Sequence, residues 1–183
     1  MNKLVSIVRP HERKLIEPLV GKTMLELGNK CNQQGVYKDY FASVGIDHTS
    51  VDLNGNTGAI LKDLHEPLNL GRFDIVTNFG TTEHVERQKP AWRNIAEATA
   101  GLFVSTTPLP GDWDWHGRWY PTEEFYKSFA DLNGFEIDRL YVGCDAPRRM
   151  ICARMKRVKD VPFVMPDMSL IYDNGEHGLG RAD

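Results

Sequence analysis

Short apolar runs alternate with stretches of helical periodicity along this chain. Residues 21–27, 47–52 and 73–79 are brief, carry apolar or β-branched side chains, and are bounded by glycine or polar residues, a pattern that predicts strands. Between the first two runs, the apolar positions of residues 33–44 recur at helical spacing, and Gly45 follows where a helix would end. This alternation predicts an α/β fold with a mostly parallel sheet.

The second half of the chain continues the alternation and then changes it. Trp92, Ile95 and Ala96 mark one face of a helix, and residues 102–107 follow as a strand. Residues 135–142 and 150–155 resemble two further strands joined by a short link, as in a hairpin. The sheet is therefore expected to end in an antiparallel pair.

The clearest helix signals lie just before this pair. Thr122 is a typical N-cap residue, and Glu123 and Glu124 suit the positive end of the helix dipole in the first turn. Asn133 and Gly134 are typical of a helix end. The sequence therefore predicts a helix between Thr122 and Gly134.

One crossover is too short to hold a helix. Only residues 53–58 separate the second strand from a possible third strand at residues 59–64, whereas a crossover between parallel strands usually takes roughly a dozen residues or more. The second crossover helix is therefore expected to be reduced or lost. We expect one compact domain over residues 1–158, followed by an irregular C-terminal tail over residues 159–183.

The composition is that of a single globular domain. Hydrophobic residues make up 41% of the 183 residues, and the net charge of -3 gives no electrostatic sign of nucleic-acid binding. No apolar run approaches the roughly 18 residues of a membrane span, and residues 1–8 lack the core of a signal peptide, so we expect a cytoplasmic protein. The three cysteines form no C-x-x-C pair, and no metal site is predicted.

Four local sequences appear in a characteristic order. Glu26-Leu27-Gly28 ends the first strand, Asp52 ends the second, and Asp63-Leu64 follows near the third. The spacing of Gly28 and Asp52 fits a strand–turn–helix–strand unit, which brings a turn and a carboxylate to neighbouring strand ends and suits a nucleoside ligand.

The order is completed by a fourth local sequence at residues 73–85, which reads Phe-Asp-Ile-Val-Thr-Asn-Phe-Gly-Thr-Thr-Glu-His-Val. It is followed at residues 116–125 by His-Gly-Arg-Trp-Tyr-Pro-Thr-Glu-Glu-Phe. Over residues 22–157 the chain resembles the small-molecule branch of the class I S-adenosylmethionine-dependent methyltransferase family. The resemblance implies a Rossmann-like, doubly wound, mostly parallel sheet with an antiparallel C-terminal strand pair. It also implies S-adenosyl-L-methionine as cofactor and a small-molecule acceptor, such as an oxygen or nitrogen of a sugar-like or aromatic compound.

The glycine-rich turn departs from the pattern of this family. The usual turn is G-x-G-x-G, and here Lys30 and Asn32 stand at the second and third glycine positions. Asparagine tolerates the left-handed region better than lysine does. Two alternatives therefore stay open: a binding or scaffold subunit without catalysis, and an enzyme that uses the same cofactor for other chemistry.

The resemblance also assigns roles to residues at the strand ends. Gly28 would pass beside the methionine part of the cofactor, and Glu26 would help to orient its amino group, directly or through water. Asp52 would hold the ribose, and the neighbouring Asn29 and Leu53 belong to the same cofactor-binding set. Asp63 and Leu64 are expected around the adenine. The loop after Asn78 and Phe79 is expected to line the methionine tail, which completes the cofactor set.

The acceptor side is expected to contain a base if the nucleophile carries a proton at neutral pH. Glu83, His84 and His116 are the candidate catalytic residues, because they lie in loops that follow strands. The aromatic loop at residues 112–120 is either a stacking wall for the acceptor or a cover for the open end of the sheet. The loop, the tail or a second subunit of a homodimer would close this side.

Overall fold

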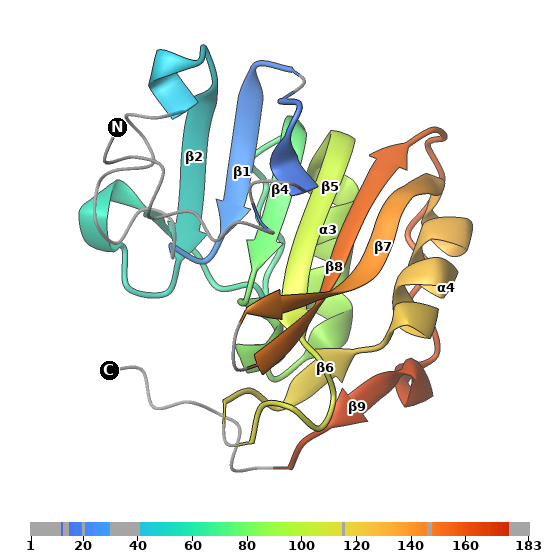
Figure 1. The fold of residues 1–183 in the computed structure, drawn as a ribbon. Helices are drawn as coiled ribbons and strands as arrows, with labels where there is room; N and C mark the ends of the chain where they lie inside the picture. Colours follow the sequence, from blue (N-terminus) through green and yellow to red (C-terminus); the bar gives the residue numbers. More distant parts are fainter. Residues whose placement is uncertain are drawn as a thin grey trace.

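The computed structural model describes residues 12, 15–19, 21–29, 41–114, 116–145 and 148–175 (Figure 1). In this part of the chain, seven strands form one sheet in the order β3-β2-β1-β4-β5-β8-β7. The strands are β1 (Thr23–Leu27), β2 (Asp47–Asp52), β3 (Ile60–Leu61), β4 (Phe73–Phe79), β5 (Thr99–Pro108), β7 (Phe135–Asp145) and β8 (Arg148–Arg157).

The first five strands run parallel, and β8 lies antiparallel between β5 and β7. This confirms the predicted mixed sheet with an antiparallel C-terminal pair. Of the predicted first crossover helix, residues 41–43 are described and helical, and the rest lies outside the described residues. No helix within the described ranges is long and apolar enough to span a membrane.

Helices α3 (Gln88–Ala98) and α4 (Glu123–Asn133) cover the same face of the sheet. Trp92 of α3 packs against Phe125 and Phe129 of α4, with ring centroids 4.6 and 5.2 Å apart. The alternation of β8 places Ile151 in this cluster and Cys152 in the cluster on the opposite face. Both faces of the sheet are therefore buried, which explains the nearly continuous apolar runs of its central strands.

Helix α4 begins and ends as its sequence predicts. The Thr122 side chain accepts a hydrogen bond from the Phe125 amide, and Gly134 adopts a left-handed conformation with φ of 71°. The Gly134 carbonyl then accepts hydrogen bonds from the amides of Val158 and Lys159 at 2.9 and 3.1 Å. The helix end is thus tied to the chain that leaves the sheet after β8.

The connection between β2 and β3 is reduced, as expected. A short 3-10 helix, η2 (Asn56–Gly58), takes the place of the crossover helix, and β3 is shorter than the predicted run of residues 59–64. The structure also has no helix at residues 62–72, between β3 and β4. The buried side chain of Asn94 in α3 holds this segment: it donates to the carbonyls of Leu64 and Glu66 at 3.0 Å and accepts from the Leu68 amide at 3.2 Å.

A second, two-stranded sheet lies beyond the ends of β4 and β5 (Figure 1). It pairs β6 (Trp119–Pro121) with β9 (Ile171–Asp173), which follows the short 3-10 helix η4 (Met168–Leu170). From the sequence, the start of β6 is expected in the aromatic loop and β9 in the irregular tail. The two strands form because they meet in space, not because either carries a strong local signal.

We expect Thr122→Ala to lower the free energy of unfolding by about 1–2 kcal/mol, because it removes an N-cap and a second hydrogen bond. The Thr122 hydroxyl also donates to the Leu170 carbonyl at 2.7 Å, so it joins α4 to the segment before β9. Urea unfolding measures the change. Thr122→Ser keeps the hydroxyl and should stay close to wild type; equal losses in both variants would contradict this account.

Candidate functional site

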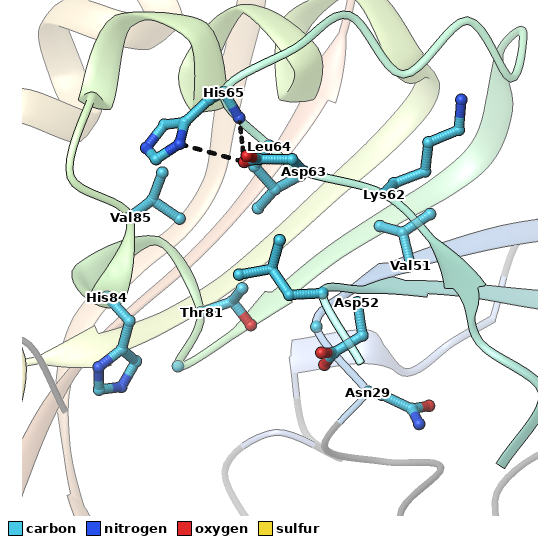
Figure 2. A pocket seen from close by; sticks show the side chains of 13 residues that line it. Asn29, Val51, Asp52, Lys62, Asp63, Leu64, His65, Thr81, His84 and Val85 are labelled. Carbon is cyan, nitrogen blue, oxygen red and sulfur yellow. Dashed lines mark hydrogen bonds and ion pairs between the residues drawn. The ribbon is translucent and has the colours of Figure 1, made fainter. Parts of the chain in front are cut away.

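A cavity of about 270 Å³ opens at the carboxyl ends of the parallel strands (Figure 2). Ligands of open α/β sheets bind at this edge, because loops from several strands meet there. The lining residues are Gly28, Asn29, Val51, Asp52, Leu53, Lys62, Asp63, Leu64, His65, Gly80, Thr81, His84 and Val85. The cavity thus collects six of the nine predicted cofactor residues and one of the three predicted catalytic residues.

The turn after β1 depends on Gly28. Its φ is +77°, and a Cβ at this position would collide with the side chain of Thr81. The Thr81 hydroxyl donates to the Leu27 carbonyl at 2.7 Å, so the loops after β1 and β4 are joined at the wall of the cavity. Both the backbone conformation and the close approach explain why glycine stands here.

Asn29 lines the cavity, but its side chain is engaged within the protein. The amide group donates to the Asn56 carbonyl and the Thr57 hydroxyl, both at 2.7 Å, and its oxygen accepts from the Ser50 hydroxyl at 3.0 Å. These bonds tie the turn after β1 to η2. Asn29 therefore shapes the wall instead of offering a free side chain to a ligand.

Asp52 stands at the end of β2, where the sequence places it. Its Oδ1 atom accepts a hydrogen bond from the Asn54 amide at 3.1 Å, which closes a tight turn. The structure gives Oδ2 no hydrogen-bond partner among the described residues, so this oxygen is available to a hydroxyl donor. Leu53 beside it is 70% exposed, an unusual position for a leucine unless a ligand or another surface covers it.

Asp63 carries a feature that the sequence analysis missed. Its Oδ1 accepts from the amide and from Nδ1 of His65, at 2.8 and 3.1 Å, as the dashed lines of Figure 2 show. The Nε2 atom of His65 accepts from the Arg87 amide at 3.2 Å, which assigns the proton to Nδ1. Both oxygen contacts fall on Oδ1, so Oδ2 of Asp63 has no partner among the described residues, next to the buried side chain of Leu64.

Three predicted cofactor residues lie behind the wall of the cavity. Glu26 is fully buried, and its Oε2 atom lies 3.0 Å from Nε2 of His48. Asn78 is also fully buried and accepts from the amides of Thr81 and Thr82 at 3.2 and 3.1 Å. Phe79 is 2% exposed and belongs to the core. These side chains support the strand ends and are not among the residues that line the cavity. Their roles toward the cofactor stay predictions.

The structure brings the three candidate catalytic residues together. Glu83 and His84 form the end of a short 3-10 helix, η3 (Thr82–His84), and His116 comes from the aromatic loop. The rings of His84 and His116 are 4.9 Å apart, and Nε2 of His116 lies 3.7 Å from Oε1 of Glu83. His84 also lines the cavity, so this cluster, here called the acceptor corner, adjoins the predicted cofactor site.

Glu83 occupies an unusual environment within the acceptor corner. It is fully buried, and neither carboxylate oxygen has a hydrogen-bond partner among the described residues. Gly117 passes directly over it: a Cβ at Gly117 would lie 2.6 Å from Cγ of Glu83. The Arg118 amide donates to the Glu83 carbonyl at 2.9 Å, so the aromatic loop is fastened to η3 at this point.

A buried network fixes the turn that carries His116. The Tyr120 hydroxyl donates to the Trp113 carbonyl at 2.6 Å and accepts from the Gly117 amide at 2.9 Å. The Asn174 side chain donates to the Gly117 carbonyl and to the Tyr120 hydroxyl, at 3.1 and 3.2 Å. Burial raises the pKa of Tyr120, so its hydroxyl stays neutral in this network.

The aromatic loop is largely a cover for the end of the sheet. Tyr120 is fully buried and Trp113 is 9% exposed, so neither presents an open stacking surface. The Trp113 ring packs against His116 with centroids 4.9 Å apart, and the guanidinium of Arg118 lies over the ring of Trp119 at 4.5 Å. Trp115 lies outside the described residues.

No protein-family model matches this chain, and neither does any curated protein sequence. Solved structures do match. Magnesium protoporphyrin IX methyltransferase from Synechocystis, solved with bound S-adenosylmethionine, has 15% identity and a TM-score of 0.59 over 86% of this chain and 85% of its own. The N-methyltransferase NodS from Bradyrhizobium japonicum, in complex with S-adenosyl-L-homocysteine, has 12% identity and a TM-score of 0.58 over 82% and 89%.

An S-adenosylmethionine-dependent methyltransferase from Mesorhizobium loti has 16% identity and a TM-score of 0.57, over 81% of this chain and 96% of its own. The chain therefore has the class I methyltransferase fold, as the sequence resemblance implied. At these identities the likeness establishes the fold and leaves the acceptor undefined.

We expect Gly117→Ala to lower the free energy of unfolding by about 1–3 kcal/mol, because the new methyl group overlaps the side chain of Glu83. A double-mutant cycle measured by urea unfolding tests the cause. In a Glu83→Gly background the overlapping atoms are gone, so the same substitution should cost much less. An equal cost in both backgrounds would refute the proposed contact.

Proposed function

We propose that this protein is a methyltransferase that uses S-adenosyl-L-methionine and transfers the methyl group to an oxygen or nitrogen of a small molecule. The observation that carries the proposal is the cavity at the carboxyl edge, where Gly28, Asp52 and Asp63 converge as they would around a nucleoside. The fold supports it, because solved proteins of the same fold hold S-adenosylmethionine or S-adenosyl-L-homocysteine.

The residues of the cavity fit the cofactor in three respects. The backbone at Gly28 carries no side chain that would block the methionine part. Asp52 offers Oδ2 to the ribose hydroxyls, which are donors that a carboxylate binds strongly. Asp63 offers its second oxygen to the adenine amino group, and the apolar Leu64 beside it suits the flat face of the ring.

Asp63 is also held in place by its neighbours. Because Oδ1 bonds to His65 twice and His65 bonds onward to the Arg87 amide, the carboxylate is oriented before a ligand arrives. A pre-oriented group loses less conformational freedom on binding than a free one. His65 is therefore proposed as a positioning residue for the adenine end of the cavity.

The acceptor corner adjoins the cavity through His84, which belongs to the cavity lining. In the view of Figure 2, His84 and Lys62 stand at opposite ends. The bound cofactor supplies an already activated methyl group, so the protein mainly has to align the acceptor and exclude water. Glu83, His84 and His116 are the groups at this end that can hold a proton or a ligand atom of the acceptor.

Calorimetric titration with S-adenosyl-L-methionine and S-adenosyl-L-homocysteine tests the cofactor assignment. Asp52→Ala should weaken binding by about 1.5–3 kcal/mol, because it removes a charged acceptor for two hydroxyl groups. Asp52→Asn is the matched variant: it keeps an oxygen for the Asn54 amide and removes the charge, so it isolates the contribution of the carboxylate to binding.

Asp47→Ala, at the other end of β2, is the control and should bind the cofactor as wild type does. Unchanged affinity in Asp52→Ala would remove the ribose role from this residue. If the wild type binds neither compound, the methyltransferase proposal fails and a scaffold protein of the same fold remains.

A further inference from the structure

The acceptor corner has the composition of a metal site. Glu83, His84 and His116 each present one ligand atom, and these three atoms lie within 4.8 Å of one another. We propose that the three side chains bind a divalent transition metal ion, of which Zn²⁺ is the representative, next to the cofactor cavity. From the sequence, the same residues are expected only as candidate bases, and no metal site is predicted.

The spacing of the atoms favours a shared ion over a direct bond. The 3.7 Å between Nε2 of His116 and Oε1 of Glu83 is too long for a hydrogen bond. Zinc holds nitrogen and oxygen ligands at roughly 2.0–2.2 Å, which puts two ligands of a tetrahedral ion about 3.3–3.6 Å apart. A shift of a few tenths of an ångström would therefore bring both atoms into one coordination shell.

The burial of Glu83 calls for a cation. A buried carboxylate without donors is costly, and such groups are normally paired or bound to a metal. The nearby Tyr126 hydroxyl is engaged with the hydroxyls of Ser105 and Thr107 at 2.8 and 3.0 Å. The Arg118 guanidinium is engaged with Glu86 and Asp173 at 2.8 and 3.1 Å. Among the described residues, the nearest cationic group to the carboxylate is the imidazole of His116, whose Nε2 lies 3.7 Å from Oε1 of Glu83 and forms no hydrogen bond with it. An ion held by both side chains would satisfy the carboxylate.

Two segments of the chain supply the three ligands: Glu83 and His84 come from η3, and His116 comes from the aromatic loop. Successive residues of a 3-10 helix point about a third of a turn apart, so adjacent Glu83 and His84 reach the corner from different directions. His116 is fixed by the Gly117 contact and by the hydrogen bonds of Tyr120 and Asn174. This support orients His116, and the three ligand atoms, which lie within 4.8 Å of one another, would close around the ion as it binds.

The donor set indicates the kind of ion and its use. Two imidazoles and one carboxylate suit zinc or iron(II) and leave further coordination positions open, whereas magnesium and calcium prefer oxygen ligands alone. Because His84 also lines the cavity, an open position would face an acceptor there. Binding of the acceptor by the ion rests on the proposed function. The preferred acceptor would then carry a hydroxyl or carboxylate oxygen that can occupy the open coordination position. Binding of the ion itself does not depend on the proposed function.

Titration of the metal-free protein with Zn²⁺ against a chromophoric chelator, without cofactor, tests the site. Wild type should bind one Zn²⁺ per chain, and Glu83→Gln and His116→Ala should each weaken binding at least tenfold, since even supporting residues of metal sites contribute roughly 10–100-fold. His65→Ala is the matched control. It removes a histidine from the same cavity but from outside the cluster, and its Zn²⁺ affinity should equal that of wild type.

Thermal unfolding with and without Zn²⁺ gives a second measurement. Zn²⁺ should raise the Tm of wild type by ligand linkage and raise that of Glu83→Gln by clearly less at the same Zn²⁺ concentration. If wild type binds no more Zn²⁺ than Glu83→Gln does, the proposal is overturned. Bound Zn²⁺ with no cofactor binding would defeat the methyltransferase proposal alone, and cofactor binding without Zn²⁺ would defeat only this inference.

Discussion

The walls of the cavity are irregular backbone, and buried irregular backbone must find hydrogen-bond partners. Two of the usual crossover helices are absent from the described part of this sheet, so regular structure does not supply those partners. Three buried asparagines do so instead. Asn29 ties the turn after β1 to η2, Asn78 holds the loop after β4, and Asn94 fastens the segment after β3 to α3.

The three asparagines hold the loops of the cavity in place before any ligand binds. Each asparagine makes several bonds at once, so each loop is held in one conformation without the length of a helix. The site is therefore built from a short stretch of chain and is largely set before a ligand binds. A chain of this fold can keep a cavity of about 270 Å³ by such means, at the cost of burying amides that must all be satisfied.

Local signals predicted the elements that local interactions determine. β1, β2, α4 and the final hairpin follow from apolar runs, an N-cap at Thr122 and a left-handed Gly134. Asp52 and Asp63 line the cavity, and local motifs at or near the strands pointed to both, while their contacts with a cofactor stay a prediction. Features that depend on distant residues were missed, namely the β6–β9 pair and the tether from Asn94. Nothing in the sequence showed that Glu26 would pair with the buried His48 and be absent from the cavity lining.

The acceptor corner differs from the rest of the edge in one physical respect. The side chains of Asn29, Asn78 and Asn94 are hydrogen-bonded, whereas both oxygens of Glu83 lack a hydrogen-bond partner among the described residues. An uncompensated buried charge lowers stability, and such groups persist mainly where a ligand completes them. Gly117 packs against the side chain of Glu83, and the hydrogen bonds of Tyr120 and Asn174 fix the turn that contains Gly117. Asn174 follows the β6–β9 pair. The C-terminal segment is therefore part of the site, because the position of His116 depends on the bonds that Asn174 makes.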